Sequence, residues 1–303
     1  MSNQNLVTRV DLHVHTTASD GLKTPEQILT EALFGLVSFT DHDNLDGYLT
    51  PIPEDKKRGA VVIPGVEVSI LLDTRMLGYK KSISQELHFL GYGLDSRNTE
   101  LNSELKKNRE RRPERLREIV RNLNRILDRE KITEDDLKEL LRQPSPSKTH
   151  LARLLKNHRY TRTTQEAFER YLTRPDVDVQ KRLIPSKIGS RLIKQAGGIV
   201  VLAHPFGHEN DSLTGITSEL EYQAAIIKNL AEEGIIQGLE CYHPLHLGIM
   251  NNALPAFYFS LCKKFKLVPT GGSDYHGDKK GDQLGRFYVP DFIGKLLLER
   301  LAA

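Results

Sequence analysis

The 303-residue sequence has only two cysteines, Cys241 and Cys262, so it offers no disulfide framework and fits a reducing compartment. No apolar run reaches about 18 residues, so no transmembrane helix is expected. The opening residues, MSNQNLVTR, lack the apolar stretch of a signal peptide. Together these absences predict a cytoplasmic protein that has no membrane segment.

Charge of one sign is also scarce, because the formal net charge is only +3. This surplus is too small to imply a nucleic-acid partner by itself. The charge is unevenly placed, since residues 105–131 hold 11 Lys or Arg against 5 Asp or Glu, which leaves the rest of the chain net negative. Two interpretations stay open for this segment: a solvated face of an amphipathic helix, or a surface that steers an anionic substrate.

Short apolar runs predict seven strands, and helical segments separate most of them. The predicted strands are 7–15, 36–40, 60–67, 86–92, 198–204, 235–242 and 267–273. The clearest helix signal is TPEQILTEALFG, with Thr24 as N-cap, Pro25 in the first turn, Gln27 at the capping-box position and Gly35 near the end. Strands that alternate with helices predict an α/β fold with a mostly parallel sheet, closed or nearly closed into a barrel.

Residues 99–184 interrupt this alternation, because they contain no convincing strand and are rich in Arg, Lys and Glu. We therefore expect an inserted helical cap subdomain at 99–184 and a barrel built from 1–98 and 185–303. The stretch 71–85 is expected to form an extended loop beside the site.

The first predicted strand raises the question of chemistry, because it carries Asp11, His13 and His15 at alternate positions. Side chains alternate between the two faces of a strand, so these three share one face and can hold an ion together. The alternative is a solvated edge strand with two surface histidines.

The other predicted strands favour the metal site. Seven of the eleven histidines stand at strand ends, and in a parallel barrel the carboxyl ends of the strands form the active site. The candidate metal ligands are His13, His15, Asp20, His42, Glu67, His88, His204, Asp274 and His276. Nitrogen and oxygen donors without thiolate suit Mn²⁺, Zn²⁺ or Fe²⁺. Nine donors exceed the needs of one ion, so two or three divalent ions are expected, with a carboxylate such as Glu67 as a bridge, and this suits phosphate-ester hydrolysis.

Seven segments, in order, resemble the PHP (polymerase and histidinol phosphatase) family of metal-dependent phosphoesterases: DLHVHTTASDG, FTDHDNLDG, GVEVS, LHFLGY, VLAHP, LECYHP and TGGSDYHG. The resemblance covers nearly the whole chain, including SKTHLARLL and EAFERYL in the insertion. It implies a distorted seven-stranded (β/α) barrel with a trinuclear centre, in which Mn²⁺ is the favoured ion.

The resemblance also implies a ligand set for each ion. The first would be held by His13, His15, Glu67 and Asp274, the second by Glu67, His88 and His204, and the third by Asp20, His42 and His276. Some relatives have histidine where this chain has Asp20, which puts the identity and tightness of the third ion in question.

Within the family, the chain looks like the stand-alone nucleotide phosphatases and 5′-end RNA exonucleases. In that subgroup an arginine of the cap motif meets substrate phosphate, and Lys148 stands at this position here. Lysine keeps the charge but loses the bidentate fork. The resemblance makes Lys148 and His150 candidates to bind phosphate, although His150 has helix capping or a buried hydrogen bond as its alternative.

Further candidates stand at the last two strand ends. His243 would protonate the leaving oxygen or bind phosphate, and Asp274 is counted with it as catalytic. Asp41 and Glu240 could orient ligand imidazoles.

The expected function is hydrolysis of a nucleotide phosphomonoester, such as a nucleoside 3′,5′-bisphosphate, by a metal-bridging hydroxide. The main alternative is a 5′-to-3′ exonuclease on short RNA or DNA, which the basic segment favours and the lack of interleaved aromatic residues opposes. A non-catalytic metal-binding accessory module would have lost ligands, and none is missing. An amidohydrolase barrel often needs a metal-bridging lysine where this chain has His88. The expected partner is a phosphorylated nucleotide or short oligonucleotide, with no membrane and no obligate protein partner.

Overall fold

The computed structural model describes residues 9–79, 83–128, 131–247, 253–277, 284–285 and 287–303. Its centre is a curled sheet in which seven strands follow the order β1, β2, β3, β4, β6, β7, β8. These are β1 (Val10–Val14), β2 (Leu36–Phe39), β3 (Val61–Asp73), β4 (Ser84–Tyr92), β6 (Ile199–Leu202), β7 (Gly238–Tyr242) and β8 (Val268–Gly271). A bridge between Val14 and Tyr275 brings the two ends of this order together, so the sheet is a distorted barrel. A short strand, β5 (Ile184–Pro185), pairs with β3 outside the order.

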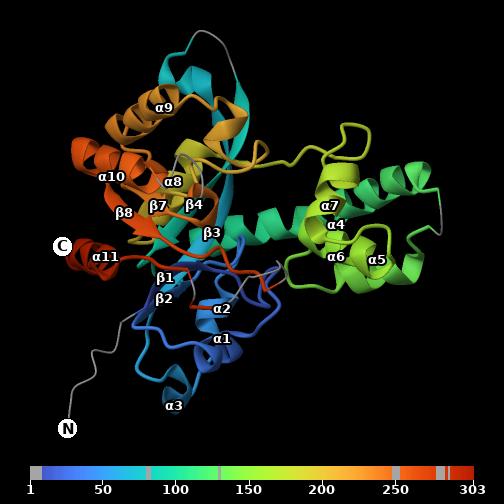
Figure 1. The fold of residues 1–303 in the computed structure, drawn as a ribbon, viewed down its shortest axis with the longest axis horizontal. Helices are drawn as coiled ribbons and strands as arrows, with labels where there is room; N and C mark the ends of the chain where they lie inside the picture. Colours follow the sequence, from blue (N-terminus) through green and yellow to red (C-terminus); the bar gives the residue numbers. More distant parts are fainter. Residues whose placement is uncertain (1–8, 80–82, 129–130, 248–252, 278–283, 286) are drawn as a thin grey trace.

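Helices cover the outer surface of the sheet (Figure 1). The barrel helices are α1 (Pro25–Glu31), α2 (Asp46–Leu49), α3 (Glu54–Lys57), α8 (Ser186–Gln195), α9 (Leu220–Glu232), α10 (Ala253–Phe265) and α11 (Asp291–Ala302), with short helices η1 (Thr74–Leu77), η3 (Leu213–Gly215) and η4 (Pro244–His246). Helix α8 packs on β3 and β6, α10 on β7 and β8, and α11 on β8 and β1. Among the described residues, no helix has the length and apolar character that a membrane crossing requires.

The predicted start of α1 is confirmed. Thr24 accepts a hydrogen bond from the Gln27 backbone N–H, and the Gln27 side chain accepts from the Thr24 N–H, which completes a capping box. Pro25 opens the helix, and Ala32 rather than Gly35 is its C-cap. Local sequence chemistry therefore marks where this helix begins, and packing of Ile28 and Leu29 in the core stabilises it.

The region of β3 and β4 differs from the prediction. These strands form a long antiparallel ladder that pairs Gly65 with Tyr92 and Asp73 with Ser84, and β4 is also antiparallel to β6. The stretch 71–85 is therefore not an extended loop: it holds the end of β3, helix η1 and the start of β4, while residues 80–82 lie outside the described part. The other neighbouring pairs in the order are parallel.

Strand β1 lies inside the protein rather than at a solvated edge. All five of its residues are buried, and Val10 and Leu12 pack in a core beneath α11. The side chain of His13 is fully buried on the other face. The edge-strand alternative is therefore wrong, and β1 presents its polar face to the barrel interior.

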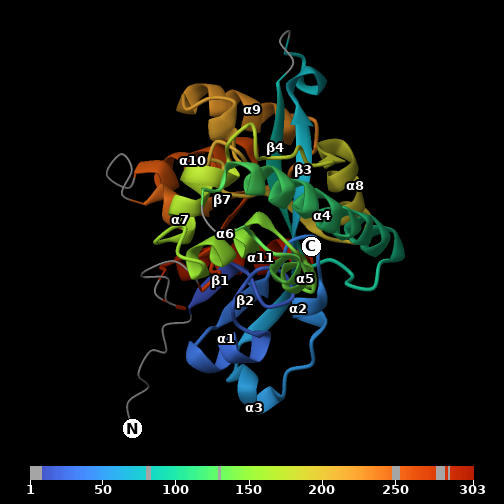
Figure 2. The ribbon, with the colours of Figure 1, turned by 90° about the vertical axis from the view of Figure 1, so that its right-hand side faces the viewer.

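The insertion consists of α4 (Thr99–Ile126), α5 (Glu134–Leu141), α6 (Lys148–Asn157), α7 (Thr164–Ala167) and the single π-helical turn η2 (Phe168–Leu172). Figure 1 shows this group of helices, which we call the cap, to one side of the sheet, and in Figure 2 the same group faces the viewer. Leu116 and Leu123 of α4 lie in the core of the cap, whereas Leu101 and Leu105 lie in the barrel core. Helix α4 thus joins both parts, and the division at residue 99 stays a prediction.

The base of the cap is anchored beside the sheet by Asp43, which follows β2. Its carboxylate accepts hydrogen bonds from Asn108 (3.2 Å) and Arg112 of α4, and its carbonyl accepts from Arg109 at 2.6 Å. The cap therefore begins directly beside His42.

Candidate metal centre and phosphate cleft

The predicted metal ligands meet at one place inside the barrel. His42, His204 and Asp274 follow β2, β6 and β8, so their approach is the one expected at the carboxyl ends of parallel strands. Glu67 and His88 arrive differently, because they lie in the middle of the β3–β4 ladder, where Ser69 pairs with His88. The placement of His88 at a carboxyl end was wrong, and the reversed direction of β4 is what brings it to the site.

One group of four donors has the spacing of a tetrahedral metal site. His13 Nε2 lies 3.4 Å from Glu67 Oε2 and 3.5 Å from Asp274 Oδ1. His15 Nε2 lies 3.2 Å from Glu67 Oε2 and 3.3 Å from Asp274 Oδ1. A tetrahedron with ligands about 2.0–2.1 Å from its centre has edges of about 3.3 Å. Three of these buried atoms, on His13, His15 and Glu67, also lack a hydrogen-bond partner. The donors therefore fit a divalent cation.

Glu67 faces a second group through its other oxygen. Glu67 Oε1 lies 2.8 Å from His88 Nδ1 and 3.2 Å from His204 Nε2. Because the two oxygens of Glu67 face different histidines, its carboxylate has the position of a bridge between two ions.

A third group gathers around Asp20. Asp20 Oδ1 lies 3.4 Å from His276 Nε2, and Asp20 Oδ2 lies 3.9 Å from His42 Nε2. His42 also faces the first group, because its Nδ1 lies 3.1 Å from Glu67 Oε2. The buried carboxylate Asp20 thus fits the position of a donor at this end of the cluster.

Electrostatics across the cluster call for positive charge. Burial alone would lower the pKa of His15, but Asp274, Glu67 and Asp20 raise it to about 10. Burial alone would raise the pKa of Glu67, but the surrounding histidines, His42 and His88 first, hold it well below its usual range. The buried carboxylates therefore require compensating cations, a role that divalent ions fill.

Two further buried carboxylates, Glu240 and Asp41, were expected to orient the ligand imidazoles. Glu240 Oε1 lies 3.0 Å from His13 Nδ1, and Glu240 Oε2 accepts a hydrogen bond from the backbone N–H of His204 at 2.7 Å. Asp41 accepts hydrogen bonds from Thr16 and Ser19 at 2.6–2.8 Å rather than from an imidazole of the described residues. Glu240 therefore orients a candidate ligand as expected, whereas Asp41 shapes the loop after β1.

The predicted substrate-binding residues occupy different surroundings. His243 Nε2 lies 3.6 Å from Asp274 Oδ2, and burial lowers the pKa of His243, a shift that Asp274 opposes. His150 Nδ1 lies 3.2 Å from the backbone N–H of Ser147, in the capping box at the start of α6. The capping alternative for His150 is therefore present in the structure, and it occupies one ring nitrogen.

A cavity of about 520 Å³ separates the metal cluster from the cap. Asp20, His42 and His88 line it on the barrel side. The cap and the return segment that follows it, residues 173–183, contribute Arg111, Arg112, Arg115, Lys148, Asp178, Lys181 and Arg182, and β4 contributes Glu86. Apart from Lys148, these residues belong to no recognised sequence motif. They come from separate segments of the chain, which the folded insertion brings together at the cavity.

Glu86 links the cap to the metal cluster. Its Oε1 lies 3.3 Å from His88 Nε2, and the same atom pairs with Lys181 of the return segment. Glu86 stands two residues before His88 in β4 and so shares its face, which is the one sequence signal that indicates this contact.

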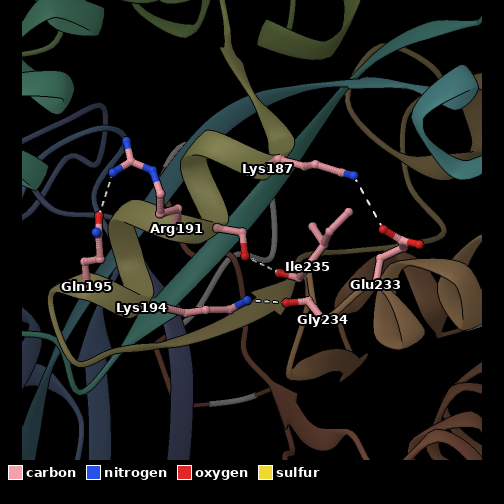
Figure 3. A pocket seen from close by; sticks show the side chains of 8 residues that line it. Lys187, Arg191, Lys194, Gln195, Glu233, Gly234 and Ile235 are labelled. Atoms are coloured by element: carbon pink, nitrogen blue, oxygen red, sulfur yellow. Dashed lines mark hydrogen bonds and ion pairs between the residues drawn. The ribbon is translucent and has the colours of Figure 1, made fainter.

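A second cavity, of about 420 Å³, lies far from this chemistry between α8 and the turn after α9 (Figure 3). Its cations already have partners, since Lys187 pairs with Glu233 at 3.4 Å, Arg191 pairs with Glu100 at 3.0 Å, and Lys194 donates to the Gly234 carbonyl. This surface therefore has no cation left without a partner for an anionic ligand.

Similarity to known proteins identifies the class of this arrangement. The chain is 29% identical to a phosphoribosyl 1,2-cyclic phosphate 1,2-diphosphodiesterase of Eggerthella lenta, over 88% of this chain and 94% of the relative. It is 30% identical to the 5′-3′ exoribonuclease Rnm of Salmonella typhimurium, over 68% of each chain. It is 26% identical to a 3′,5′-nucleoside bisphosphate phosphatase of Chromobacterium violaceum, over 90% of this chain and 88% of the relative. No protein-family model matches the sequence.

The fold also has a solved counterpart. A Bifidobacterium adolescentis protein, whose assignment as a metal-dependent phosphoesterase is provisional, superposes with a TM-score of 0.77 over 97% of this chain and 96% of its own, at 23% identity. Fold, donor cluster and relatives define a metal-dependent phosphoric ester hydrolase. The chain belongs to the PHP family of metal-dependent phosphoesterases.

Proposed function

We propose that the chain hydrolyses a phosphate ester on a ribose that carries a second phosphoryl group, with a nucleoside 3′,5′-bisphosphate as the leading substrate. The observation that carries this proposal is a single cavity with a metal-donor cluster on one wall and a group of cap cations on the other. Its volume of about 520 Å³ lies in the usual range of about 300–1,000 Å³ for small-molecule sites. The substrates in the names of the Eggerthella and Chromobacterium relatives both combine a ribose with two phosphate positions.

In this proposal the donor groups described above hold two or three divalent ions. His13, His15, Glu67 and Asp274 hold the first, Glu67, His88 and His204 the second, and Asp20, His42 and His276 the third. Imidazoles and carboxylates without a thiolate suit Mn²⁺, Zn²⁺ and Fe²⁺, and the family resemblance favours Mn²⁺ among them. Such ions activate water and neutralise the oxygens of the reacting phosphate.

The chain's own side chains then orient the substrate and handle a proton. His243 lies beside Asp274 and binds the reacting phosphate or gives a proton to its leaving oxygen. Lys148 holds the second phosphate from the cap, and its lack of a bidentate fork weakens that grip relative to arginine. His150 supports Lys148 by capping helix α6, and its remaining ring edge is available for phosphate.

A 5′-to-3′ exonuclease activity on short oligonucleotides is the second candidate. Arg117 and Arg121 of α4 are exposed and add to the positive charge of the cap surface, and an exposed basic surface can bind a phosphate backbone. The Salmonella relative carries this activity in its name.

The test is phosphate release by the Mn²⁺-loaded protein from adenosine 3′,5′-bisphosphate, AMP, histidinol phosphate, phosphoribosyl 1,2-cyclic phosphate and a 5′-phosphorylated RNA pentamer. We expect the bisphosphate to react fastest, and the Asp274→Asn variant to be inactive while keeping its fold, because asparagine tolerates the positive φ of 50° at this position. Stepwise release of mononucleotides from the pentamer would support the second candidate. Full activity in the Asp274→Asn variant would refute the assigned centre.

A further inference from the structure

The cap carries a carboxylate at the place where a substrate phosphate is expected. Asp178 Oδ1 accepts a hydrogen bond from Arg115 at 2.7 Å, and Asp178 Oδ2 accepts one from Lys148 Nζ at 3.0 Å. All three residues line the cavity that faces the metal cluster. The Asp178 side chain is 33% exposed, whereas those of Arg115 and Lys148 are 15% and 13% exposed. The carboxylate therefore sits on the open side of the two cations.

The geometry resembles that of a bound phosphate. One acidic group contacts a guanidinium from α4 and an ammonium from the start of α6 through different oxygens, as a phosphoryl group does. The other partners given for the two cations are carbonyls, of Val179 for Arg115 and of Leu172 for Lys148. No further anion among the described residues is bonded to them, so departure of Asp178 would expose two positive charges to the cavity.

Asp178 is placed where it can leave. Residues 173–183 form the return segment between η2 and β5, and they contain no helix or strand. Asp178 Oδ1 also accepts from the adjacent Val179 backbone N–H at 2.9 Å, a bond that a rotation of one side chain breaks. Burial lowers the pKa of Lys148, and the charge of Asp178 opposes that shift.

We propose that Asp178 is a specificity-determining counter-ion, which pairs with Arg115 and Lys148 in the empty cleft and is displaced by the second phosphoryl group of the substrate. The inference rests on the proposed function, because it assigns the second phosphate to this pair of cations. A dianionic phosphoryl group carries more charge than the carboxylate and can replace it, whereas a hydroxyl group at the same position cannot. Asp178 therefore lowers affinity for bisphosphates while it stabilises the cap before they bind.

The test compares Asp178→Asn with Asp176→Asn, a matched control in which the lost carboxylate pairs with Arg174 on the surface at 2.8 Å. We expect Asp178→Asn to lower KM for adenosine 3′,5′-bisphosphate about tenfold, because the competing charge is gone, and to raise the bisphosphate-to-AMP selectivity in kcat/KM by a similar factor. In a Lys148→Met background this decrease in KM should shrink at least threefold, because one of the two cations for which Asp178 and the phosphate compete is gone. Asp176→Asn should leave KM within twofold of the parent.

A purely structural role for Asp178 predicts the opposite result. In that case the substitution loosens the cap and raises KM for both substrates, and the proposal is overturned. Binding of adenosine 3′,5′-bisphosphate to the chelator-treated full chain, measured by calorimetry, separates the two proposals. If the loaded protein hydrolyses no phosphate ester, tighter calorimetric binding in Asp178→Asn still supports the counter-ion, and equal or weaker binding refutes it.

Discussion

Replacing Glu240 by glutamine should weaken metal binding without unfolding the protein. Glu240 is fully buried and uses one oxygen on His13 Nδ1 and the other on the His204 backbone N–H. Glutamine has nearly the same shape but only one acceptor oxygen, so it can keep one of these two contacts. His13 and His204 belong to different donor groups around Glu67, and the substitution therefore disturbs two candidate ion sites at once.

The size of the effect follows from the loss of one supporting contact to a ligand imidazole. Such losses typically reduce metal affinity by about 10–100-fold, or about 1.4–2.7 kcal/mol. Glu240 also supplies one of the negative charges near His13, and its removal adds to the loss in the same direction. We therefore place the expected effect at the upper end, near 100-fold.

The assay is Mn²⁺ affinity by competition with a chelator, with melting temperatures of the metal-free proteins as a folding check. Glu232→Gln is the matched control, because the Glu232 carboxylate is exposed on α9 and forms a surface ion pair with Lys228 at 3.7 Å. An Mn²⁺ affinity of Glu240→Gln within threefold of the parent would refute the orienting role. A lower melting temperature with unchanged affinity would assign Glu240 to the fold alone.

Two other perturbations test the packing and the titration of the interior. Gly272→Ala should destabilise the chain by about 2–3 kcal/mol in urea unfolding, because its Cβ would lie 2.3 Å from the backbone nitrogen and Cβ of His13; a loss below about 1 kcal/mol contradicts this. Burial lowers the pKa of His246 to about 3, so its unfolded form, with a pKa near 6.5, binds more protons as the pH falls. Stability should therefore drop by about 2 kcal/mol between pH 7.5 and 5 from this residue, and His246→Gln should reduce that slope; an unchanged slope would refute it.

The sequence predicted the parallel strands of the barrel and the gathering of histidines and carboxylates inside it, because both depend on short-range patterns. Alternation in β1 separates Leu12 from His13, and the capping residues around Pro25 define the first helix. Histidines and carboxylates at the ends of parallel strands must meet, so their convergence follows once the strands are recognised.

The direction of β4 and the content of the cleft could not be predicted in the same way. Strand direction depends on pairing across the β3–β4 ladder, which the alternation of side chains does not encode. The pairs Lys181–Glu86 and Arg115–Asp178 join residues more than sixty positions apart through an insertion that lacks a recognisable period. These contacts require the return segment to pack against both α4 and β4, and they determine which charges face the cleft.

Backbone conformation adds a constraint that no residue pattern reveals. His204 and Asp274, two candidate ligands from different groups, have φ values of 24° and 50°, and Asp43, beside His42, has 50°. Left-handed backbone costs a residue other than glycine about 1–2 kcal/mol, so these positions are held against their local preference. A glycine at either ligand position would relieve the strain but remove the donor. The strain is therefore the structural consequence of pointing His204 at Glu67 and Asp274 at His13 and His15, and it concentrates where the proposed chemistry requires fixed geometry.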